Sequence, residues 1–396
     1  MPDYNFNRIV DRRNTNAIKW MGLPSERPDL IPMGVADMDF QAPPEVLDAM
    51  RKRIDHGIFG YTSPSKEDNE AIASWVELRH NDDISDACLM HLPGVVCGMR
   101  AAVSVLTKPG DTIVVQTPVH TPFFFTASHA GRVLAICNLL NDGHDNYAMN
   151  YVELERMFAR GVRMMLLCSP QNPMGRVWTR DELLKLVLLC RKYNVILLSD
   201  ETHRDLVAPG VTHVPMDSIP EARDMSATFF SPAKTFNFGG MCIATAVTHN
   251  SNFARQIRQY VNDVHFGRIS QMDIVAQTAA YQKCAAWLDQ LRQVLDANIT
   301  CAMNALEGLP VFAQRPQCSF LIWLNLSKLR MTTGQLDDFL VHKAGIRAEM
   351  GSIYQTPEYM AYNGLEDHIR LNLGMPPPII EKAMRQFRNA VIDCKS

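Results

Sequence analysis

The stretch RMMLLCSPQNPMGRVWTRDELLKLVLLCRKYNVILLSD, residues Arg163–Asp200, predicts a complete strand–helix–strand unit. Two brief, mostly apolar runs, Arg163–Cys168 and Val195–Ser199, are typical of buried strands. Between them, Thr179–Tyr193 has apolar residues at helical spacing, with a threonine at its start and Glu182 three residues later, which is the pattern of a capped helix. Two such strands joined by a helix favour a βαβ unit in a parallel sheet.

The same pattern continues on both sides of this unit. Four further brief apolar runs are found at Thr112–Val115, Val133–Cys137, Ala227–Phe230 and Cys242–Val247. Helical patterns separate the runs, so we expect an α/β fold with a largely parallel sheet and helices on both of its faces.

The pattern changes in the last third of the chain, which indicates a second domain. Trp287–Leu306 has the spacing of a long helix, and Ser319–Leu324 and His368–Leu373 have the composition of strands. A chain of 396 residues is also too long for one ordinary core. We therefore expect a large α/β domain and a smaller α+β domain, divided as residues 46–287 and residues 1–45 with 288–396.

Composition and charge exclude several classes of protein. The chain is 47% hydrophobic and 20% charged, as folded proteins are, and its formal net charge of −3 argues against a nucleic-acid partner. No apolar stretch is long enough for a bilayer, and the N-terminal residues lack the apolar region of a secretory signal. The ten cysteines form no metal-binding pattern, so we expect reduced thiols, no metal and a cytoplasmic location.

Polar side chains follow three of the predicted strands. They lie in Ser169–Pro173, Asp200–His203 and Ser231–Thr235, and they include Asn172 and Lys234. Open α/β sheets bind their ligands at the carboxyl ends of strands. Each cluster alone has an ordinary alternative, since a carboxylate after a strand is often a helix cap and a loop lysine is usually solvated. The order of asparagine, aspartate and lysine, each after a strand, favours a shared site.

These residue types suit pyridoxal 5'-phosphate (PLP). The Lys234 amine can form an imine with the aldehyde and, once released, can move a proton. The Asp200 carboxylate can keep the pyridine nitrogen protonated, and Asn172 can donate a hydrogen bond to the ring phenolate oxygen.

The phosphate of such a cofactor needs backbone N–H groups at a helix start. Pro93–Met99 precedes the helical stretch Arg100–Leu106 and can supply them. An ordinary loop before a helix is the alternative. The residues that we predict to hold the phosphate here are Val96, Cys97, Gly98 and Met99.

A series of specific motifs runs in order along nearly the whole chain, from about residue 5 to about residue 390. The motifs are ADMDF (Ala36–Phe40), FGYT (Phe59–Thr62), the tryptophan and RH of WVELRH (Trp75–His80), PGVV (Pro93–Val96), PVxxPF (Pro118–Phe123), CSPQNPMGRVW (Cys168–Trp178), SDExHxDL (Ser199–Leu206), KTFNFGGM (Lys234–Met241), WL (Trp287–Leu288) and RLNLG (Arg370–Gly374). The sequence resembles the aspartate aminotransferase superfamily of fold type I PLP enzymes (class I/II). Within it, the sequence resembles the cystathionine β-lyase/cystalysin group of C–S lyases.

The resemblance implies a three-layer α/β/α large domain with a mostly parallel seven-stranded sheet. It also implies roles for individual residues. Lys234 and Asp200 are expected to be the catalytic residues, with Lys234 holding PLP as a Schiff base and Asp200 at the pyridine nitrogen. Asn172 contacts the ring oxygen, and His203 lies beside that oxygen.

Further roles follow from the same resemblance. Tyr61 is expected to reach the phosphate of the neighbouring subunit, which implies a homodimer. Ser231 is expected to place a hydroxyl near the phosphate. Arg370 is expected to bind the substrate α-carboxylate, because a guanidinium can donate two parallel hydrogen bonds to it, and Ala36 and Asn172 complete the substrate contacts. The ordinary alternative for Arg370 is a charge on an edge strand facing water.

Three residues depart from the pattern of the group. His120 stands where a tyrosine usually stacks on the pyridine ring, Ala233 replaces a serine, and Cys97 replaces a proline. Imidazole can stack on the ring and can also titrate near neutral pH, so one hypothesis is that His120 tunes the cofactor with pH. The alternative is a neutral aromatic filler.

The resemblance favours β-elimination from an L-cysteine-type amino acid such as cystathionine, giving a thiol, pyruvate and ammonia. An aminotransferase that uses the same cofactor residues is the main alternative. A regulatory binding protein that retains PLP is a third. The first two share their early steps, so the sequence leaves both open.

Overall fold

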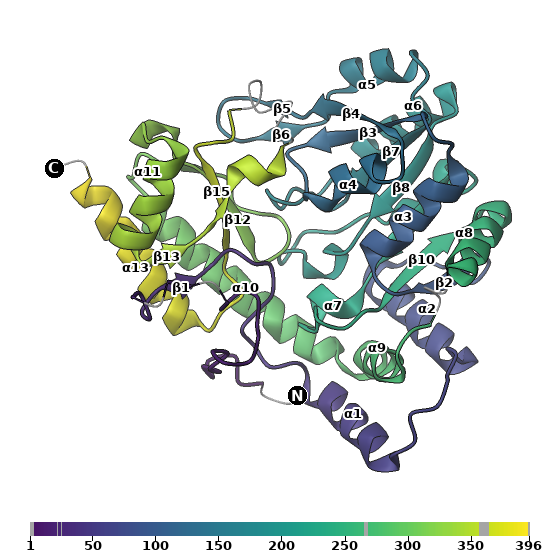
Figure 1. Cartoon of the computed structure of the whole chain (residues 1–396), viewed down its shortest axis with the longest axis horizontal. Coiled ribbons are helices and arrows are strands. Elements are labelled where there is room, and N and C mark those ends of the chain that lie inside the picture. Colours follow the sequence, from purple (N-terminus) through teal and green to yellow (C-terminus); the bar gives the residue numbers. More distant parts are fainter. Residues whose placement is uncertain (1–3, 22, 25, 265–267, 356–363, 395–396) are drawn as a thin grey trace.

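The computed structural model describes residues 4–21, 23–24, 26–264, 268–355 and 364–394. Its main feature is a seven-stranded sheet with the strand order β2-β10-β9-β8-β7-β3-β4 (Figure 1). Strands β9, β8, β7, β3 and β4 are parallel to their neighbours in that run, and β10 pairs antiparallel with both β9 and β2. The strands of this sheet are β2 (Cys88–Leu92), β3 (Thr112–Thr117), β4 (Val133–Asn138), β7 (Met164–Cys168), β8 (Ile196–Asp200), β9 (Ser226–Phe230) and β10 (Ala244–Thr248).

The central strands bury both of their faces, as the apolar runs predicted. In β7, Met164 and Leu166 belong to one hydrophobic cluster and Met165 and Leu167 to another, because successive side chains point to opposite faces. Helices cover both faces, which confirms the predicted three-layer α/β/α arrangement. The helices of this part are α1 (Pro44–His56), α2 (Lys66–His80), α3 (Val95–Leu106), α4 (Pro122–Ser128), α5 (Tyr151–Phe158), α6 (Arg180–Tyr193), α7 (Pro232–Thr235), α8 (Ser251–Asp263) and α9 (Gln271–Lys283).

Helix α6 begins where its sequence predicted. The Thr179 hydroxyl accepts a hydrogen bond from the backbone N–H of Glu182, and the Glu182 carboxylate accepts one from the Thr179 N–H. This reciprocal pair satisfies two backbone donors that the first helical turn leaves free. Asn194 ends the helix in the left-handed conformation and leads directly into β8.

A second sheet lies beside the first and is built from the C-terminal part of the chain. Its four strands are antiparallel in the order β11-β12-β15-β14, and they lie on the side of the molecule that carries the C-terminus (Figure 1). Its elements are β11 (Phe312–Ala313), β12 (Leu321–Asn325), β14 (Glu349–Met350), β15 (His368–Asn372), α10 (Ala285–Leu306), α11 (Thr333–Asp338) and α13 (Pro377–Asp393). Apolar residues of α10, α11 and α13 form one cluster with those of β12 and β15.

The N-terminal segment packs on this second part through a short parallel pair. Strand β1 (Ile31–Pro32) pairs with β13 (Ile346–Arg347). A further short pair, β5 (Leu140–Asn141) with β6 (Tyr147–Ala148), forms a separate two-stranded sheet that follows β4 in the chain. The division at residues 45 and 287 stays a prediction. Among the residues that the structure describes, no helix is both long and apolar enough to cross a membrane.

Candidate active site

A cavity of about 360 Å³ opens at the carboxyl ends of β7, β8 and β9. All three polar clusters that the sequence singled out contribute to it, because adjacent parallel strands end at the same edge of the sheet. Its lining residues are Ala36, Pro93, Gly94, Val95, Val96, Cys97, His120, Cys168, Asn172, Asp200, Thr202, His203, Ser231, Ala233, Lys234, Gly239, Met241, Cys242 and Ile243.

Lys234 lies on α7, a single helical turn directly after β9. Its Nζ donates a hydrogen bond to the backbone carbonyl of Ala36, so the amine points into the cavity and toward the N-terminal segment. Burial, together with the positive charge of Arg370, lowers the pKa of Lys234 to about 8. The amine therefore exists in both its neutral and its charged form near neutral pH.

Asp200 is the last residue of β8 and is buried at the floor of the same cavity. Its Oδ1 atom accepts hydrogen bonds from the backbone N–H of Thr202, at 3.0 Å, and from the Thr202 hydroxyl. Burial raises the pKa of Asp200, whereas the Thr202 bonds and the charge of Lys234 act in the opposite direction. A carboxylate held in this way gains from a cationic neighbour in the cavity.

Arg370 and Asn172 come from different sheets and meet at the site. The Nη1 atom of Arg370 donates to Oδ1 of Asn172 over 3.1 Å, and Nη2 donates to the carbonyl of Gly34 over 3.0 Å. Arg370 is buried in β15, which has β12 on one side and β14 on the other, so it is not a solvated charge on an edge strand. Its Nε atom is buried and has no hydrogen-bond partner within the described residues. The guanidinium thus contacts a residue of the cavity lining, Asn172, and keeps one buried donor without a partner among the described residues.

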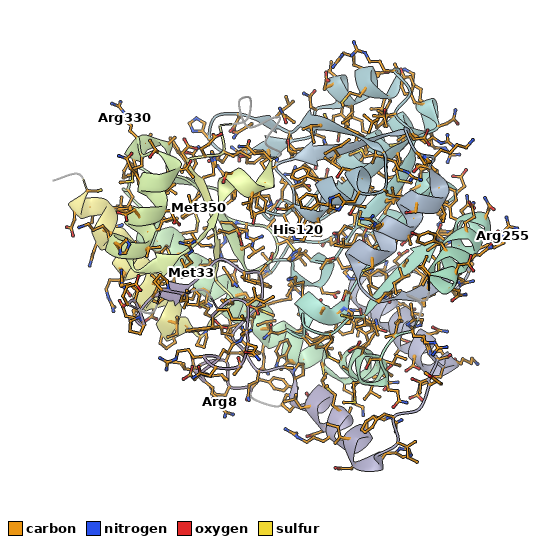
Figure 2. The ribbon with its side chains drawn as sticks, in the orientation of Figure 1. Arg8, Met33, His120, Arg255, Arg330 and Met350 are labelled. Carbon is orange, nitrogen blue, oxygen red and sulfur yellow. The ribbon has the colours of Figure 1, made fainter. Side chains whose placement is uncertain are left out.

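Two imidazoles line the cavity, and burial favours the neutral form of both. Burial, with Arg370 and Lys234 nearby, lowers the pKa of His120 to about 3, and burial also lowers the pKa of His203 well below its usual value. His120 lies near the middle of the molecule, between the large sheet and the C-terminal elements (Figure 2). The Nδ1 atom of His203 is buried without a hydrogen-bond partner in the described part of the chain. These pKa shifts favour the neutral filler over the titrating role for His120.

The predicted phosphate cradle lies at the start of α3, which begins at Val95 rather than at Arg100. Gly94 precedes the helix at a φ of 126°, a conformation that glycine adopts readily, and the first N–H groups of the helix then face the cavity edge. Val96 and Cys97 line the cavity.

The other two cradle residues have different surroundings. The N–H of Gly98 donates to the carbonyl of Gly94 over 3.0 Å, as in an ordinary helix. A Cβ atom at Gly98 would lie 2.4 Å from Leu92, so this glycine lets α3 approach the sheet closely. Met99 is buried in the core between helix and sheet. The geometry thus gives Gly98 and Met99 a packing role.

Ser231 lines the cavity, but its hydroxyl already has partners. It accepts from the N–H of Ala233 at 3.1 Å, which caps α7, and it donates to the carbonyl of Ile243 at 2.6 Å. Its contact with a phosphate stays a prediction.

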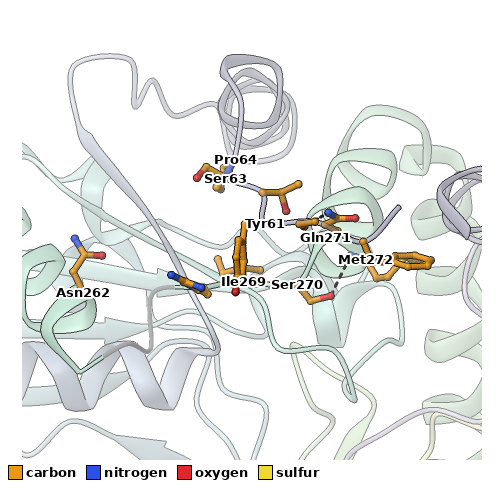
Figure 3. A pocket seen from close by; sticks show the side chains of 12 residues that line it. Tyr61, Ser63, Pro64, Asn262, Ile269, Ser270, Gln271 and Met272 are labelled. Carbon is orange, nitrogen blue, oxygen red and sulfur yellow. Dashed lines mark hydrogen bonds between the residues drawn. The ribbon is translucent and has the colours of Figure 1, made fainter. Parts of the chain in front are cut away.

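Tyr61 lies outside this cavity and is 91% exposed. Tyr61 and Gln271 line a separate hollow of about 790 Å³ (Figure 3). Arg268 also lines it, and its guanidinium lies 4.4 Å from the centre of the Tyr61 ring. Within one chain, Tyr61 therefore does not join the residues around Lys234.

Sequence reasoning missed several residues that line the cavity. Thr202 lies in the predicted Asp200–His203 cluster but was given no role, although its place two residues after Asp200 indicated that it could hold that carboxylate. Cys168 and Met241 lie at the ends of two quoted motifs but were given no role. Cys242 and Ile243 had no signal, because a single apolar residue or cysteine carries no chemistry that a pattern could reveal.

Comparison with known proteins identifies the family. The sequence profile described as aminotransferase class I and II matches residues 28–387. The chain belongs to this family. Cystathionine beta-lyase PatB of Bacillus subtilis (strain 168) is 33% identical over 393 residues, covering 98% of this chain and 100% of that protein.

Two solved structures of the family are similar over almost their whole length. Cystalysin from Treponema denticola, which contains a pyridoxal 5'-phosphate cofactor, superposes with a TM-score of 0.91 at 30% identity, covering 99% of this chain and 100% of that chain. A PLP-bound putative aminotransferase from Clostridium difficile 630 superposes with a TM-score of 0.92 at 33% identity, covering 98% and 100%.

The residues of this family member fit PLP. The cavity offers a lysine amine for the aldehyde, a buried carboxylate for the pyridine nitrogen, and helix N–H groups for the phosphate. It also contains a buried imidazole nitrogen that lacks a partner among the described residues, on His203. An unpartnered buried polar atom is costly, so a polar ligand that contacts it is favoured.

Proposed function

We propose that this protein is a PLP-dependent C–S β-lyase that cleaves L-cysteine-type substrates, such as cystathionine, to a thiol, pyruvate and ammonia. The observation that carries the proposal is the convergence of Lys234, Asp200 and Asn172 on one cavity, with Arg370 hydrogen-bonded to Asn172. The similarity to PatB, a cystathionine beta-lyase, and to cystalysin supports this reaction class over others in the family.

Bound PLP supplies an electron sink that stabilises negative charge at the substrate Cα. Asp200 would contact the pyridine nitrogen and Asn172 the ring oxygen, with the start of α3 at the phosphate. Lys234 removes the Cα proton, and its lowered pKa suits that task near neutral pH. Arg370 binds the α-carboxylate and so holds the Cα–H bond toward Lys234.

The elimination step itself needs no further oxidant or reductant. The electron pair of the Cα–H bond forms the Cα–Cβ double bond, and the pair of the Cβ–S bond leaves with the sulfur as a thiolate. Water then hydrolyses the released enamine to pyruvate and ammonia. The neutral imidazole of His120 provides an aromatic surface beside the reacting groups, and it adds no positive charge that would repel the protonated pyridine nitrogen.

The active unit is a homodimer in this proposal, and it acts in the cytoplasm. The exposure of Tyr61 supports the dimer. A tyrosine that contacts the cofactor of the neighbouring subunit is expected to lie away from the cofactor cavity of its own chain, as Tyr61 does. Exposed Ile58 and Phe59 adjoin it, and buried apolar surface is what subunit interfaces require.

The test is pyruvate release from L-cystathionine in the presence of PLP and without any added keto acid. A C–S lyase forms pyruvate and thiol in equal amounts over many turnovers. An aminotransferase stops after one turnover until a keto acid is added. A regulatory binding protein binds PLP, with its absorbance band, and releases no pyruvate under either condition.

A further inference from the structure

The buried carboxylate of Asp205 lies near the active site but does not line its cavity. Asp205 is 5% exposed, and its two oxygens accept hydrogen bonds from three side chains. Oδ1 lies 3.1 Å from Nε1 of Trp75 and 2.9 Å from Nε2 of His80, and Oδ2 lies 2.9 Å from the Thr235 hydroxyl. All four residues lie within the quoted motifs, but none of the four has a role of its own in the proposed chemistry.

The three donors come from separate parts of the chain. Trp75 and His80 lie on α2, and Thr235 is the last residue of α7, next to Lys234. Asp205 itself belongs to the turn Arg204–Leu206 that follows the Asp200–His203 segment. One side chain therefore ties α2, the turn after β8 and the lysine-bearing helix together.

Helix α7 is too short to hold its own position. It has four residues, and a single helical turn gains few internal hydrogen bonds for the conformational freedom that it loses. The Ser231 hydroxyl caps its start, and the Thr235 hydroxyl anchors its end to Asp205. Thr235 is completely buried, so no water can substitute for the carboxylate as its acceptor.

The charge of Asp205 is maintained by its surroundings. Burial acts to raise the pKa of Asp205, but the hydrogen bond from His80, the charge of Arg204 and the hydrogen bond from Thr235 together hold the pKa below its usual value. The pKa of His80 is itself lowered to about 4 by burial and by Arg204, so His80 donates as a neutral imidazole at pH 7. Asp205 thus remains an acceptor for all three donors throughout the neutral range.

We propose that Asp205 is a positioning residue, which acts through the Thr235 hydroxyl to fix the direction from which Lys234 reaches into the cavity. The proposal rests on the role of Lys234 in the proposed function. A shift of about 1 Å in a reacting group can cost roughly 100-fold in rate, so a single anchor next to the catalytic lysine is sufficient to matter.

The decisive variants are Thr235→Val, which keeps the shape and removes the hydroxyl, and Thr235→Ser, which keeps the hydroxyl. We expect Thr235→Val to lower kcat about 10- to 100-fold with KM changed less than threefold, and Thr235→Ser to stay within threefold of the wild type. Trp75→Phe is the matched structural control, because it removes a different hydrogen bond to the same carboxylate. It should lower the unfolding temperature while kcat stays within threefold.

A second readout does not depend on lyase activity. Apoenzyme is mixed with PLP, borohydride is added at intervals, and peptide mass spectrometry measures the fraction of Lys234 that carries the reduced cofactor. Thr235→Val should slow this labelling at least fivefold relative to Thr235→Ser. Because labelling needs only the lysine and PLP, it tests positioning even if cystathionine proves not to be the substrate.

Three results would overturn the proposal. One is equal kcat and equal labelling rates for Thr235→Val and Thr235→Ser. Another is a loss of kcat in Trp75→Phe as large as that in Thr235→Val, which would show that general destabilisation explains both. The third concerns the case in which Thr235→Val does not fold, when Thr235→Ala takes its place. A normal kcat and a normal labelling rate in Thr235→Ala would then overturn the proposal.

Discussion

The Nη1 atom of Arg370 donates a hydrogen bond to Oδ1 of Asn172 over 3.1 Å, and this bond joins the second sheet to the edge of the first. Arg370 lies in the middle of β15, and Asn172 lies in the loop after β7. The proposed substrate-binding guanidinium and a proposed cofactor-contacting amide are therefore fixed relative to each other by direct contact. In the proposed function, binding of the substrate carboxylate at Arg370 would therefore also affect the Asn172 side chain that contacts the cofactor.

The first prediction tests this guanidinium. Arg370→Lys keeps the charge but loses the fork of donors, so we expect kcat/KM to fall about 10- to 100-fold, mainly through KM. Steady-state kinetics with cystathionine measures the change. Arg347→Lys is the control, since Arg347 is half-exposed and pairs with Asp337 at 3.0 Å on the surface. Equal kinetics for the two variants would remove Arg370 from the substrate site.

The second prediction concerns Asp200. Asp200→Asn removes the negative charge that would face the pyridine nitrogen, and charge stabilisation of this kind is typically worth about 10²–10³ in rate. We expect kcat to fall by that factor at saturating PLP, with a small change in KM. A variant that needs more PLP but regains the wild-type rate once saturated would assign Asp200 to cofactor affinity instead.

The third prediction tests the composite site. Tyr61→Phe and Lys234→Ala are each expected to be poorly active, and in a dimer with shared sites a mixed dimer carries one site that is intact. Unfolding and refolding the two variants together should therefore give more activity than the sum of the two refolded separately. No gain on mixing, in a sample shown to contain mixed dimers, would place Tyr61 outside the partner's site.

The sequence predicted six of the seven strands of the large sheet because five of them are apolar on both faces and the sixth, β4, is largely so. The seventh, β2, was missed. Its residues Cys88–Leu92 include His91, and the strand lies at the sheet edge, so it has neither a continuous apolar run nor a clear alternation. The antiparallel direction of β10 could not be predicted either, because strand direction depends on how the chain connects the strands in space and not on their composition.

The candidate site could be predicted where a residue type has a chemical reason to be present. Lys234, Asp200 and Asn172 met that condition, and the structure places all three in one cavity. Gly98 did not, because a glycine near a helix start can serve either ligand approach or helix packing, and only the 2.4 Å approach to Leu92 distinguishes the two. The hydrogen bonds of Asp205 could not be predicted, because they join three segments that are far apart in the sequence and come together only on folding.

The fourth prediction concerns His120. Since its pKa is lowered to about 3, the imidazole is neutral at every pH at which the enzyme is assayed. His120→Tyr is therefore expected to leave the shape of the kcat profile unchanged between about pH 5.5 and 9, a range around the ordinary histidine value of roughly 6.5. The level of kcat can differ between the two proteins. An acid limb that is present in the wild type and absent in the tyrosine variant would restore the titrating role.

The last prediction concerns a charged cluster around His368 that joins the second sheet to the turn between β5 and β6. His368, at the start of β15, lies 2.7 Å from Asp367 and 3.4 Å from Asp145, which follows β5, and its ring stacks on Trp323 with centroids 5.3 Å apart. Burial acts to lower the pKa of His368, but the hydrogen bonds and charges of the two carboxylates outweigh it and raise the pKa to about 9.

Because the folded-state pKa of His368 lies above the unfolded value of about 6.5, the protonated imidazole stabilises the fold. The contribution is fully present below about pH 6.5 and is lost as the pH rises through 9. A shift of this size corresponds to about 3 kcal/mol. The free energy of unfolding of wild type and His368→Gln, measured in urea, should therefore differ by about 3 kcal/mol more at pH 6 than at pH 9.5.

His342→Gln is the control, because His342 is half-exposed and has only a 3.6 Å contact with Asp338. The difference in unfolding free energy between wild type and His342→Gln should stay below about 0.5 kcal/mol at both pH values. A difference for His368→Gln that does not change with pH would mean that the residue contributes packing and no charge.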